Sequence, residues 1–262
     1  FIYFFTFFAS YNKLKIILKK KKPKFLIVNL LTYIPFILFL NNHFKTKLIL
    51  KISGMPKLNF FRLILWKFSN KNIDLVFCPT KETMNYLKKK KIFDHNKIKF
   101  LPDPVIFKEE IKNLEKKKVK HIHKKNSFFL SIGRLTKQKN HKLLINLYSK
   151  FQFKEKLLII GDGELKQNLL KLIQSKNLEY KISILPFQKN IFHYIKKSKA
   201  IIIPSLWEDP GFVMIESAMC NTFIISSNCP NGPIEFIQKD KSGLLFESNR
   251  LDNLVKKFDY FM

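Results

Sequence analysis

The sequence predicts an α/β protein built on parallel, doubly wound sheets. Short β-rich runs alternate with helical stretches along the chain, and the alternation is clearest in the second half. Most of these runs are continuously apolar, as expected for strands whose two faces are both buried in a parallel sheet. The chain has 262 residues, of which 46% are hydrophobic and 15% aromatic, so it is long enough to bury substantial cores.

The first half, residues 1–107, is predicted to be an incomplete domain of this kind. Its β-rich runs are Lys24–Asn29, Leu48–Ile52 and Asp74–Cys78, with helical stretches between them. Thr80 is expected to cap a helix from Lys81 to about Lys90, because Glu82 follows it in the first turn. The second domain is predicted at residues 127–262, after a charged connection over 108–126 that is poor in apolar residues.

An apolar stretch, Phe25–Leu40, is shorter than the roughly 20 residues that a membrane-spanning helix needs. It contains Asn29 and Pro35, and we expect a buried strand, a loop and the start of a helix there. The chain begins with Phe1, and its apolar start precedes the lysines, which does not support a signal peptide. We interpret the chain as truncated at its N-terminus, and 250–262 as a helix cut short.

The second half predicts six strands separated by helices. The predicted strands are Phe128–Ile132, Leu157–Ile160, Ile182–Ile184, Ala200–Ile203, Phe223–Ser226 and Gly243–Phe246. The predicted helices are Asn140–Phe151, Leu165–Gln174, Asn190–Lys197 and Phe212–Cys220. Ligands of such sheets bind beyond the carboxyl ends of the strands, and the notable polar residues fall just after strands, which predicts one shared site.

The formal net charge of +30 permits two interpretations. It can attract nucleic acid or an anionic membrane surface, or it can reflect A/T-rich codons, since Lys, Ile, Asn and Phe are abundant; we favour the second origin. Arginine is scarce and the aromatic residues lie in apolar runs, which argues against a nucleic-acid binder. The stretch Tyr11–Lys22 places Leu14, Ile17 and Leu18 on one helical face, which suits either an anionic lipid surface or, as we prefer, packing within the domain.

Three cysteines, Cys78, Cys220 and Cys229, have no paired spacing. A disulfide framework and a structural zinc site are therefore not expected, and a reducing cytosol is the expected setting. We interpret the three as small buried residues. His193 is likewise expected to be a surface or packed histidine.

Two glutamates, Glu208 and Glu216, flank a turn that opens a helix at Gly211, directly after the predicted strand Ala200–Ile203. Free N–H groups at a helix start can bind a phosphate, and carboxylates accept hydrogen bonds from sugar or ribose hydroxyls. The motif therefore predicts a ligand that is anionic at one end and rich in hydroxyls elsewhere, such as a nucleotide-sugar.

Three further loops follow predicted strands. Gly133–Asn140 carries Arg134, Lys137 and Lys139, which can neutralise a diphosphate, although a solvated basic loop is an equally good interpretation. Gly161–Glu164 is a tight glycine turn, which alone is only weak evidence for phosphate binding. A third loop, Asn228–Glu235, reads equally as an ordinary capped turn.

Taken in order, Gly-Arg-Leu with Gln-Lys-Asn, Ile-Gly-Asp-Gly, Pro-Ser with the paired glutamates, and Gly-Pro-x-Glu resemble the retaining family-four glycosyltransferases (glycosyl transferases group 1) of the GT-B fold. The resemblance is strong over 128–246 and weaker over 24–105. It implies two Rossmann-like domains facing a cleft. It also implies a metal-independent, hexosyltransferase-type enzyme that needs no cofactor and uses a nucleotide-sugar as co-substrate.

The resemblance also implies a role for each matching residue. The catalytic residues would be Arg134 and Lys139, which hold the donor diphosphate, and Glu208, which contacts the transferred sugar. The donor-binding residues would be Gly133, Gly161, Gly163, Gly211, Phe212, Val213 and Glu216, with Glu216 at the ribose. Retention in this family is ascribed to front-face attack within an ion pair, so neither glutamate need be a covalent nucleophile.

The sequence departs from the family pattern in Glu208-Asp-Pro-Gly211, where the family often has Glu-Gly-Phe-Gly, and at Asn221 and Pro186, which stand where glycine is frequent. The family's first strand and glycine-rich loop have no counterpart. The acceptor-side histidine often found in the first domain has no clear match either, which leaves the acceptor-side residue unassigned. We expect transfer to a glycan or lipid-linked acceptor in cell-envelope polysaccharide synthesis. The expected location is cytoplasmic, with peripheral contact at the inner face of the membrane. The alternatives are another GT-B activity, an epimerase or phosphorylase, and a basic membrane-surface binding module without activity.

Overall fold

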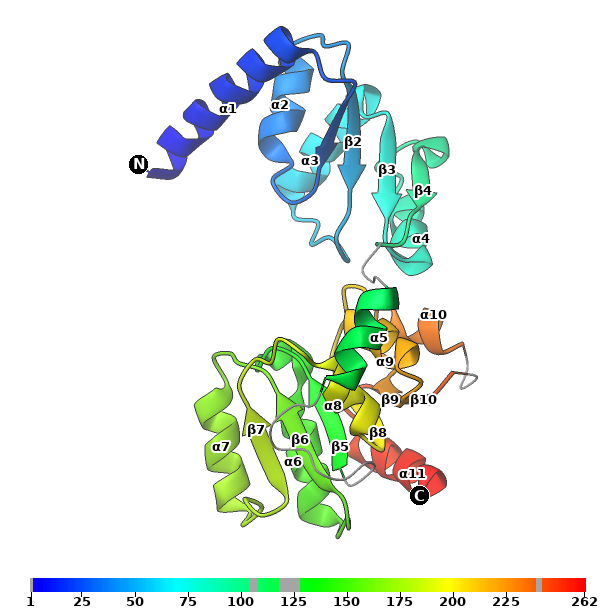
Figure 1. Ribbon diagram of the computed structural model, residues 1–262. Coiled ribbons are helices and arrows are strands. Elements are labelled where there is room, and N and C mark those ends of the chain that lie inside the picture. The colour runs from blue at the N-terminus through cyan, green and yellow to red at the C-terminus, as the bar shows by residue number, and fades with distance from the viewer. Residues whose placement is uncertain (1, 104–107, 118–127, 239–241) are drawn as a thin grey trace. The chain divides into compact units, whose positions relative to one another are not determined.

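The computed structural model describes residues 2–103, 108–117, 128–238 and 242–262 (Figure 1). The chain divides into two compact units, Phe1–Asp103 and Pro104–Met262. Each unit is built on a parallel sheet, as the alternation of strands and helices predicts.

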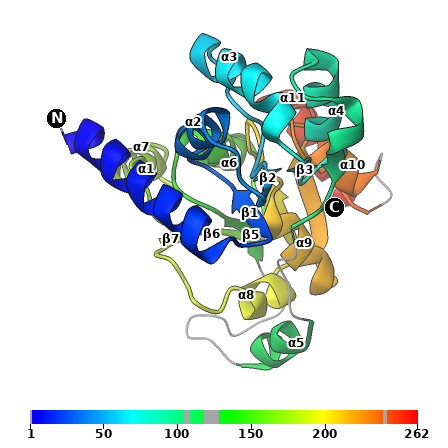
Figure 2. The same cartoon turned by 90° about the horizontal axis from the view of Figure 1, so that it is seen from above.

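The first unit has a four-stranded sheet in the consecutive order β1-β2-β3-β4. The strands are β1 (Phe25–Val28), β2 (Lys47–Lys51), β3 (Leu75–Cys78) and β4 (Ile98–Phe100), and the helices are α1 (Ile2–Lys21), α2 (Tyr33–Asn41), α3 (Phe60–Ser69) and α4 (Lys81–Lys90). Right-handed crossovers between strands in consecutive order place α2, α3 and α4 on the same face of the sheet (Figure 2). Thr80 caps α4 as predicted, because its hydroxyl accepts from the Thr83 N–H at 3.1 Å.

The prediction of a buried strand at the start of Phe25–Leu40 is wrong. Strand β1 forms, but Phe25 is 48% and Ile27 59% exposed, and only Val28 is buried. The strand lies at the edge of the sheet, and only its alternate residues Leu26 and Val28 pack in the core of the unit. Strand β4, which is three residues long, has no counterpart among the predicted strands.

Helix α1 packs as a helix of the first unit, which is the alternative that the sequence favours. Leu18 is buried in the core of this unit, and Tyr11 and Leu14 pack against the same cluster. Ile17, predicted on the same face, is 45% exposed. Among the described helices, none combines the length and the apolar character required to cross a membrane.

The second unit has a six-stranded parallel sheet in the order β10-β9-β8-β5-β6-β7. Its strands are β5 (Phe128–Ile132), β6 (Lys156–Ile160), β7 (Ile182–Leu185), β8 (Ala200–Ile203), β9 (Phe223–Ser227) and β10 (Leu244–Phe246). Its helices are α5 (Lys108–Lys116), α6 (His141–Lys150), α7 (Lys166–Ser175), α8 (Phe192–Lys197), α9 (Phe212–Met219), α10 (Pro233–Ile237) and α11 (Leu251–Phe261). All six predicted strands form, each within one residue of its predicted ends.

Both faces of this sheet are covered, so the strands carry two cores. Phe129 lies in one core together with residues of α6, α7 and α11. The next residue, Leu130, points to the other face and packs with residues of α8 and α9. This alternation explains why the strands read as continuously apolar runs. The three cysteines are free and buried, as predicted.

Part of the predicted connection over 108–126 forms α5, which packs on the second unit through Ile111. Asn190 donates to the Leu114 carbonyl at 2.9 Å, and the buried His193 ring nitrogen Nδ1 lies 2.8 Å from the Glu115 carbonyl oxygen. His193 is thus a packed histidine that holds α5. Residues 118–126 lie outside the described part of the chain.

Candidate active site

The direction of strand order reverses between β5 and β8 in the second unit. The chain runs from β5 outward through β6 to β7, returns to β8, and continues outward on the other side through β9 to β10. The helices that follow β5 and β8 therefore lie on opposite faces, which leaves a crevice beyond the carboxyl ends of these two strands. The loops 133–140 and 204–211 flank that crevice, and they hold all three residues predicted to be catalytic.

The structure joins two of those three, Lys139 and Glu208, across the crevice. The Lys139 ammonium donates to both carboxylate oxygens of Glu208, at 2.7 Å and 2.8 Å. Glu208 is only 3% exposed. An ionised carboxylate at this depth requires a partner, because burying an unpaired charge costs several kcal/mol. The ion pair therefore holds both side chains at the carboxyl edge of the sheet.

A serine hydroxyl also holds the same carboxylate. Ser205, which is fully buried, donates from Oγ to Glu208 Oε1 at 2.5 Å. Its own carbonyl accepts from the Ser227 hydroxyl at 2.5 Å, which ties the loop to the end of β9. Glu208 thus has both oxygens occupied by donors, and its orientation is fixed by two neighbouring strands.

Gln138 links the two loops directly. The Gln138 side-chain amide donates to the Trp207 carbonyl at 3.0 Å, and the main-chain carbonyl of Gln138 accepts from the Leu206 N–H at 2.8 Å. Sequence reasoning assigned no role to Gln138 or to Ser205. Both stand inside recognised motifs, Gln-Lys-Asn and Pro-Ser. The Gln138 contact reaches a loop 69 residues away, which spacing along the chain does not reveal, whereas the Ser205 hydroxyl bonds Glu208 only three residues further on.

Arg134 lies in the same loop but is exposed. Its closest hydrogen-bond contact in the described part of the chain is Gln138 Oε1, at 3.5 Å from Nη2. The guanidinium therefore remains available for an anionic ligand, since its contact to a neutral amide leaves its charge uncompensated.

The glycine turn after β6 packs directly under the loop after β5. A Cβ atom on Gly161 would lie 2.0 Å from the Gly133 carbonyl oxygen, and one on Gly163 would lie 2.6 Å from the Leu135 carbonyl oxygen. No side chain fits at these distances. The predicted donor-binding glycines Gly133, Gly161 and Gly163 thus bring two strand ends into contact and fix the path of the loop that carries Lys139.

Helix α9 begins at the crevice. Gly211, just before it, has φ +90°, a conformation that favours glycine, and a Cβ there would lie 2.6 Å from Met214 Cε. The first amides of a helix, here those of Phe212 and Val213, have no acceptor within the helix and carry its positive dipole. These predicted phosphate contacts lie at the same strand end as Glu208.

Glu216, further along α9, is half-buried, and burial raises the pKa of its carboxyl above the ordinary value. In the described part of the chain no residue is hydrogen-bonded to its carboxylate. Its acceptor capacity is therefore unused, in contrast to that of Glu208. A half-buried carboxylate with free lone pairs is suited to accept hydrogen bonds from a hydroxyl-bearing ligand.

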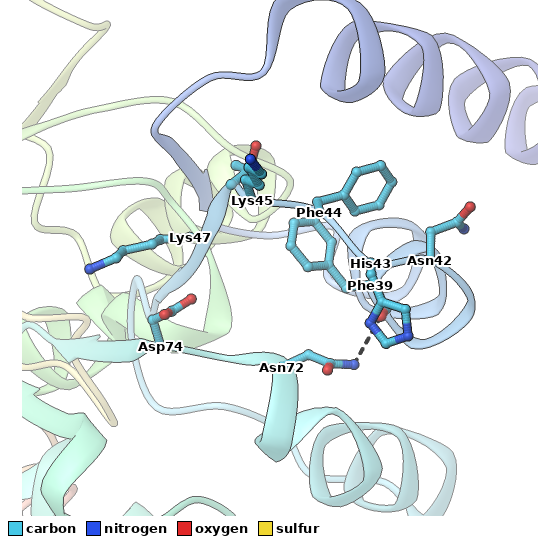
Figure 3. Close-up of a pocket in the computed structure, with 9 residues that line it drawn as sticks. Phe39, Asn42, His43, Phe44, Lys45, Lys47, Asn72 and Asp74 are labelled. Carbon is cyan, nitrogen blue, oxygen red and sulfur yellow. Dashed lines mark hydrogen bonds between the residues drawn. The ribbon is translucent and has the colours of Figure 1, made fainter.

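A pocket of about 320 Å³ in the first unit is unrelated to this site (Figure 3). It lies at the amino end of β2, beside His43 and Phe44, whereas parallel sheets bind ligands at the carboxyl ends. Its Asp74 accepts from the Leu48 N–H at 2.7 Å, and its Asn72 donates to the Phe39 carbonyl at 2.9 Å. Both polar side chains are thus occupied in joining elements of the first unit.

Comparison with known proteins identifies the family. The family model described as "Glycosyl transferases group 1" matches residues 112–262, which is more than half of the chain and includes every residue of the candidate site. The chain belongs to the glycosyl transferases group 1.

Two curated relatives extend the match. This group 1 chain is 35% identical over 147 residues to an N-acetylgalactosamine-N,N'-diacetylbacillosaminyl-diphospho-undecaprenol 4-alpha-N-acetylgalactosaminyltransferase of Campylobacter jejuni, covering 56% of this chain and 40% of the relative. It is 32% identical over 250 residues to an uncharacterized glycosyltransferase of Methanocaldococcus jannaschii, covering 87% of this chain and 61% of the relative. The chain thus spans between about two fifths and three fifths of these relatives.

Solved structures agree on the fold of this group 1 chain. The crystal structure of a glycosyltransferase from Rickettsia africae matches with a TM-score of 0.78 at 19% identity, over 98% of this chain and 71% of that one. With both sheets parallel, the predicted GT-B fold of two Rossmann-like units is confirmed.

Proposed function

We propose that this chain is the nucleotide-sugar-binding part, with a portion of the acceptor side, of a glycosyltransferase that moves a hexose with retention of configuration. The observation that carries the proposal is the buried Lys139–Glu208 pair at the switch point of the second sheet. A cation and a carboxylate held together there fit a ligand whose diphosphate and sugar hydroxyls lie side by side.

Different residues of the site would bind different parts of the donor. Lys139 and Arg134 would neutralise the diphosphate and stabilise the charge that develops on it as the sugar departs. Glu208, fixed by Ser205, would accept hydrogen bonds from the sugar hydroxyls. The amides of Phe212 and Val213 would face the phosphates. Glu216 would accept from the ribose, since its carboxylate, unlike that of Glu208, has no hydrogen-bond donor among the described residues.

We infer that the reaction requires no metal, because these cations and the start of α9 supply the positive charge that a metal would otherwise contribute. Retention is proposed to proceed by attack from the face that the leaving group vacates. Glu208 then acts by orienting the sugar, since Lys139 and Ser205 hold its carboxylate in place with three hydrogen bonds and leave an acceptor site for a sugar hydroxyl.

The acceptor is proposed to be a glycan or a lipid-linked saccharide of a cell-surface polysaccharide. The Campylobacter jejuni relative is named for a diphospho-undecaprenol acceptor, which supports a lipid-linked class. We propose a cytoplasmic protein that meets such an acceptor at a membrane surface.

Incubation of the chain with radiolabelled nucleotide-sugars and a lipid-linked saccharide tests this function. We expect label in the acceptor product, with the anomeric configuration of the donor retained when the product is examined by NMR. The variant Lys139→Met should lose the product, whereas Lys137→Met, a change to an exposed lysine of the same loop, should keep it. Conversion of the donor to an epimer without transfer, or a strict need for inorganic phosphate, would instead establish the epimerase or the phosphorylase.

A further inference from the structure

Helix α3 of the first unit is apolar on its solvent side as well as on its packed side. Its packed side buries Trp66, whose indole N–H donates to the Thr32 hydroxyl at 3.1 Å. Its outer side presents Phe60, Phe61, Ile64 and Phe68, which are 71%, 80%, 37% and 68% exposed. We call these four residues the α3 outer face. A helix with one buried side normally carries polar residues on the other, so this face requires an occupant.

The charges around the face are of one sign. Lys57, Lys67 and Lys71 are exposed on and beside α3, and Arg62 stacks over the Trp66 ring with its guanidinium carbon 6.0 Å from the ring centre. No acidic residue occurs in the sequence before Asp74, whereas residues 1–73 contain 14 lysines and arginines. The acid that approaches the end of α3, Asp94, accepts from Asn70 and pairs with Lys97.

We propose that the α3 outer face docks the first unit onto an anionic lipid surface. Exposed aromatic side chains inserted at the headgroup boundary would be flanked by lysines that contact the anionic headgroups, the combination that holds amphipathic helices in a membrane interface. This inference rests on the proposed function in one respect only, since a lipid-linked acceptor is the reason for such an enzyme to visit a membrane.

The position of α3 supports that use. The helix follows β2, so Phe60 and Phe61 at its start lie toward the carboxyl edge of the first sheet, where ligands of parallel sheets bind. Docking through this end brings the ligand-binding edge of the unit to the lipid surface. Helix α1 is less suited, because Leu14 and Leu18 are occupied in the core.

Co-sedimentation with phosphatidylcholine vesicles, with and without phosphatidylglycerol, tests the proposal. Wild-type chain should sediment with the anionic vesicles and be released by salt. Phe61→Glu combined with Phe68→Glu should weaken partitioning by at least about tenfold, because two apolar contacts become repelled charges. Phe61→Ser with Phe68→Ser should weaken it less but clearly, which separates lost insertion from added charge.

Matched variants keep the test specific. Tyr260→Glu changes an aromatic residue of the second unit that is 81% exposed, and it should bind vesicles like the wild type. Ile16→Glu on α1 should also bind like the wild type. Equal sedimentation of the α3 variants and the wild type would overturn the proposal, as would loss of binding through Ile16→Glu alone. Light scattering that showed an α3-dependent dimer without vesicles would assign the face to a second copy of the chain instead. Nucleotide binding by the same samples reports separately on the donor site.

Discussion

Both units consist of a parallel sheet packed with helices, but the order of the strands differs between them. In the first unit the strands follow each other in consecutive order, and the crossover helices fall on one face. In the second the order reverses between β5 and β8, and helices cover both faces. The predicted catalytic residues lie on the two loops that flank this reversal. Topology, more than composition, thus determines where a site can form.

The two units also differ in the polarity of the side chains that they bury and expose. The second unit buries a linked set of polar side chains around Glu208, which includes Lys139 and Ser205. The described residues of the first unit instead leave large apolar side chains in contact with solvent, on β1 and on α3. We interpret the second unit as the binder of a polar donor and the first as the unit that approaches a lipid surface.

The sharpest contrast between the two units is expected from breaking an ion pair in each. Lys139→Met should reduce the free energy of unfolding of the second unit by roughly 3 kcal/mol, because Glu208 remains buried without its cation. Lys51→Met, which breaks the more exposed pair with Asp103 in the first unit, should cost about 1 kcal/mol or less.

Urea unfolding of both variants measures the contrast. The double variant with Lys139→Met and Glu208→Gln should recover much of the loss, because the buried charge has gone as well. If Lys139→Met and Lys51→Met reduced the free energy of unfolding equally, the buried Lys139–Glu208 pair would contribute no more to stability than an ordinary surface ion pair.

A second prediction concerns acid, and it singles out the second unit. His141, which is buried at the start of α6, has its pKa lowered to about 3, chiefly by burial and then by the charge of Lys139. Below the ordinary value of 6.5 the unfolded chain binds a proton that the folded chain does not, so stability falls as pH decreases from 6.5 toward 3. The loss should amount to several kcal/mol, at about 1.4 kcal/mol for each unit of pKa.

His141→Leu should flatten that dependence, as measured by unfolding at a series of pH values. If plots of the free energy of unfolding against pH for the variant and the wild type stay parallel from neutral pH to pH 3, the buried His141 ring is not the source of the acid sensitivity.

A smaller effect of opposite sign is expected at Glu216. Burial raises its folded pKa, so its ionised form destabilises the fold at neutral pH, and stability falls as pH rises from the ordinary value of 4.5 through the folded value. Glu216→Gln should therefore raise the free energy of unfolding at neutral pH, by less than about 1 kcal/mol given its partial exposure. The control is Glu179→Gln, which changes an exposed glutamate at the other end of the sheet and should leave the free energy of unfolding unchanged. A destabilised Glu216→Gln would mean that the carboxylate has a structural role instead.

Much of the second unit is predictable from its sequence, because its strands are buried on both faces and read as apolar runs. The helix start at Thr80 is predictable for a local reason, its hydroxyl and the acid that follows. The exposure of β1 is not, since an edge strand and a central strand can have the same apolar composition. In the site, Glu208 and Lys139 are found from motifs, but their direct pairing is a consequence of strand order. Gln138 is found only through its contact with a distant loop, and Ser205 only through the orientation of its hydroxyl toward Glu208.

Titration calorimetry of the chain with UDP, GDP and ADP is the most direct test of the donor site at the switch point. We predict that one of the three binds, that Glu216→Gln weakens its binding at least about tenfold by replacing a charged ribose acceptor with a weaker neutral one, and that Glu179→Gln leaves it unchanged. Binding that survives unchanged in both Glu216→Gln and Lys139→Met would place the nucleotide elsewhere and contradict the account.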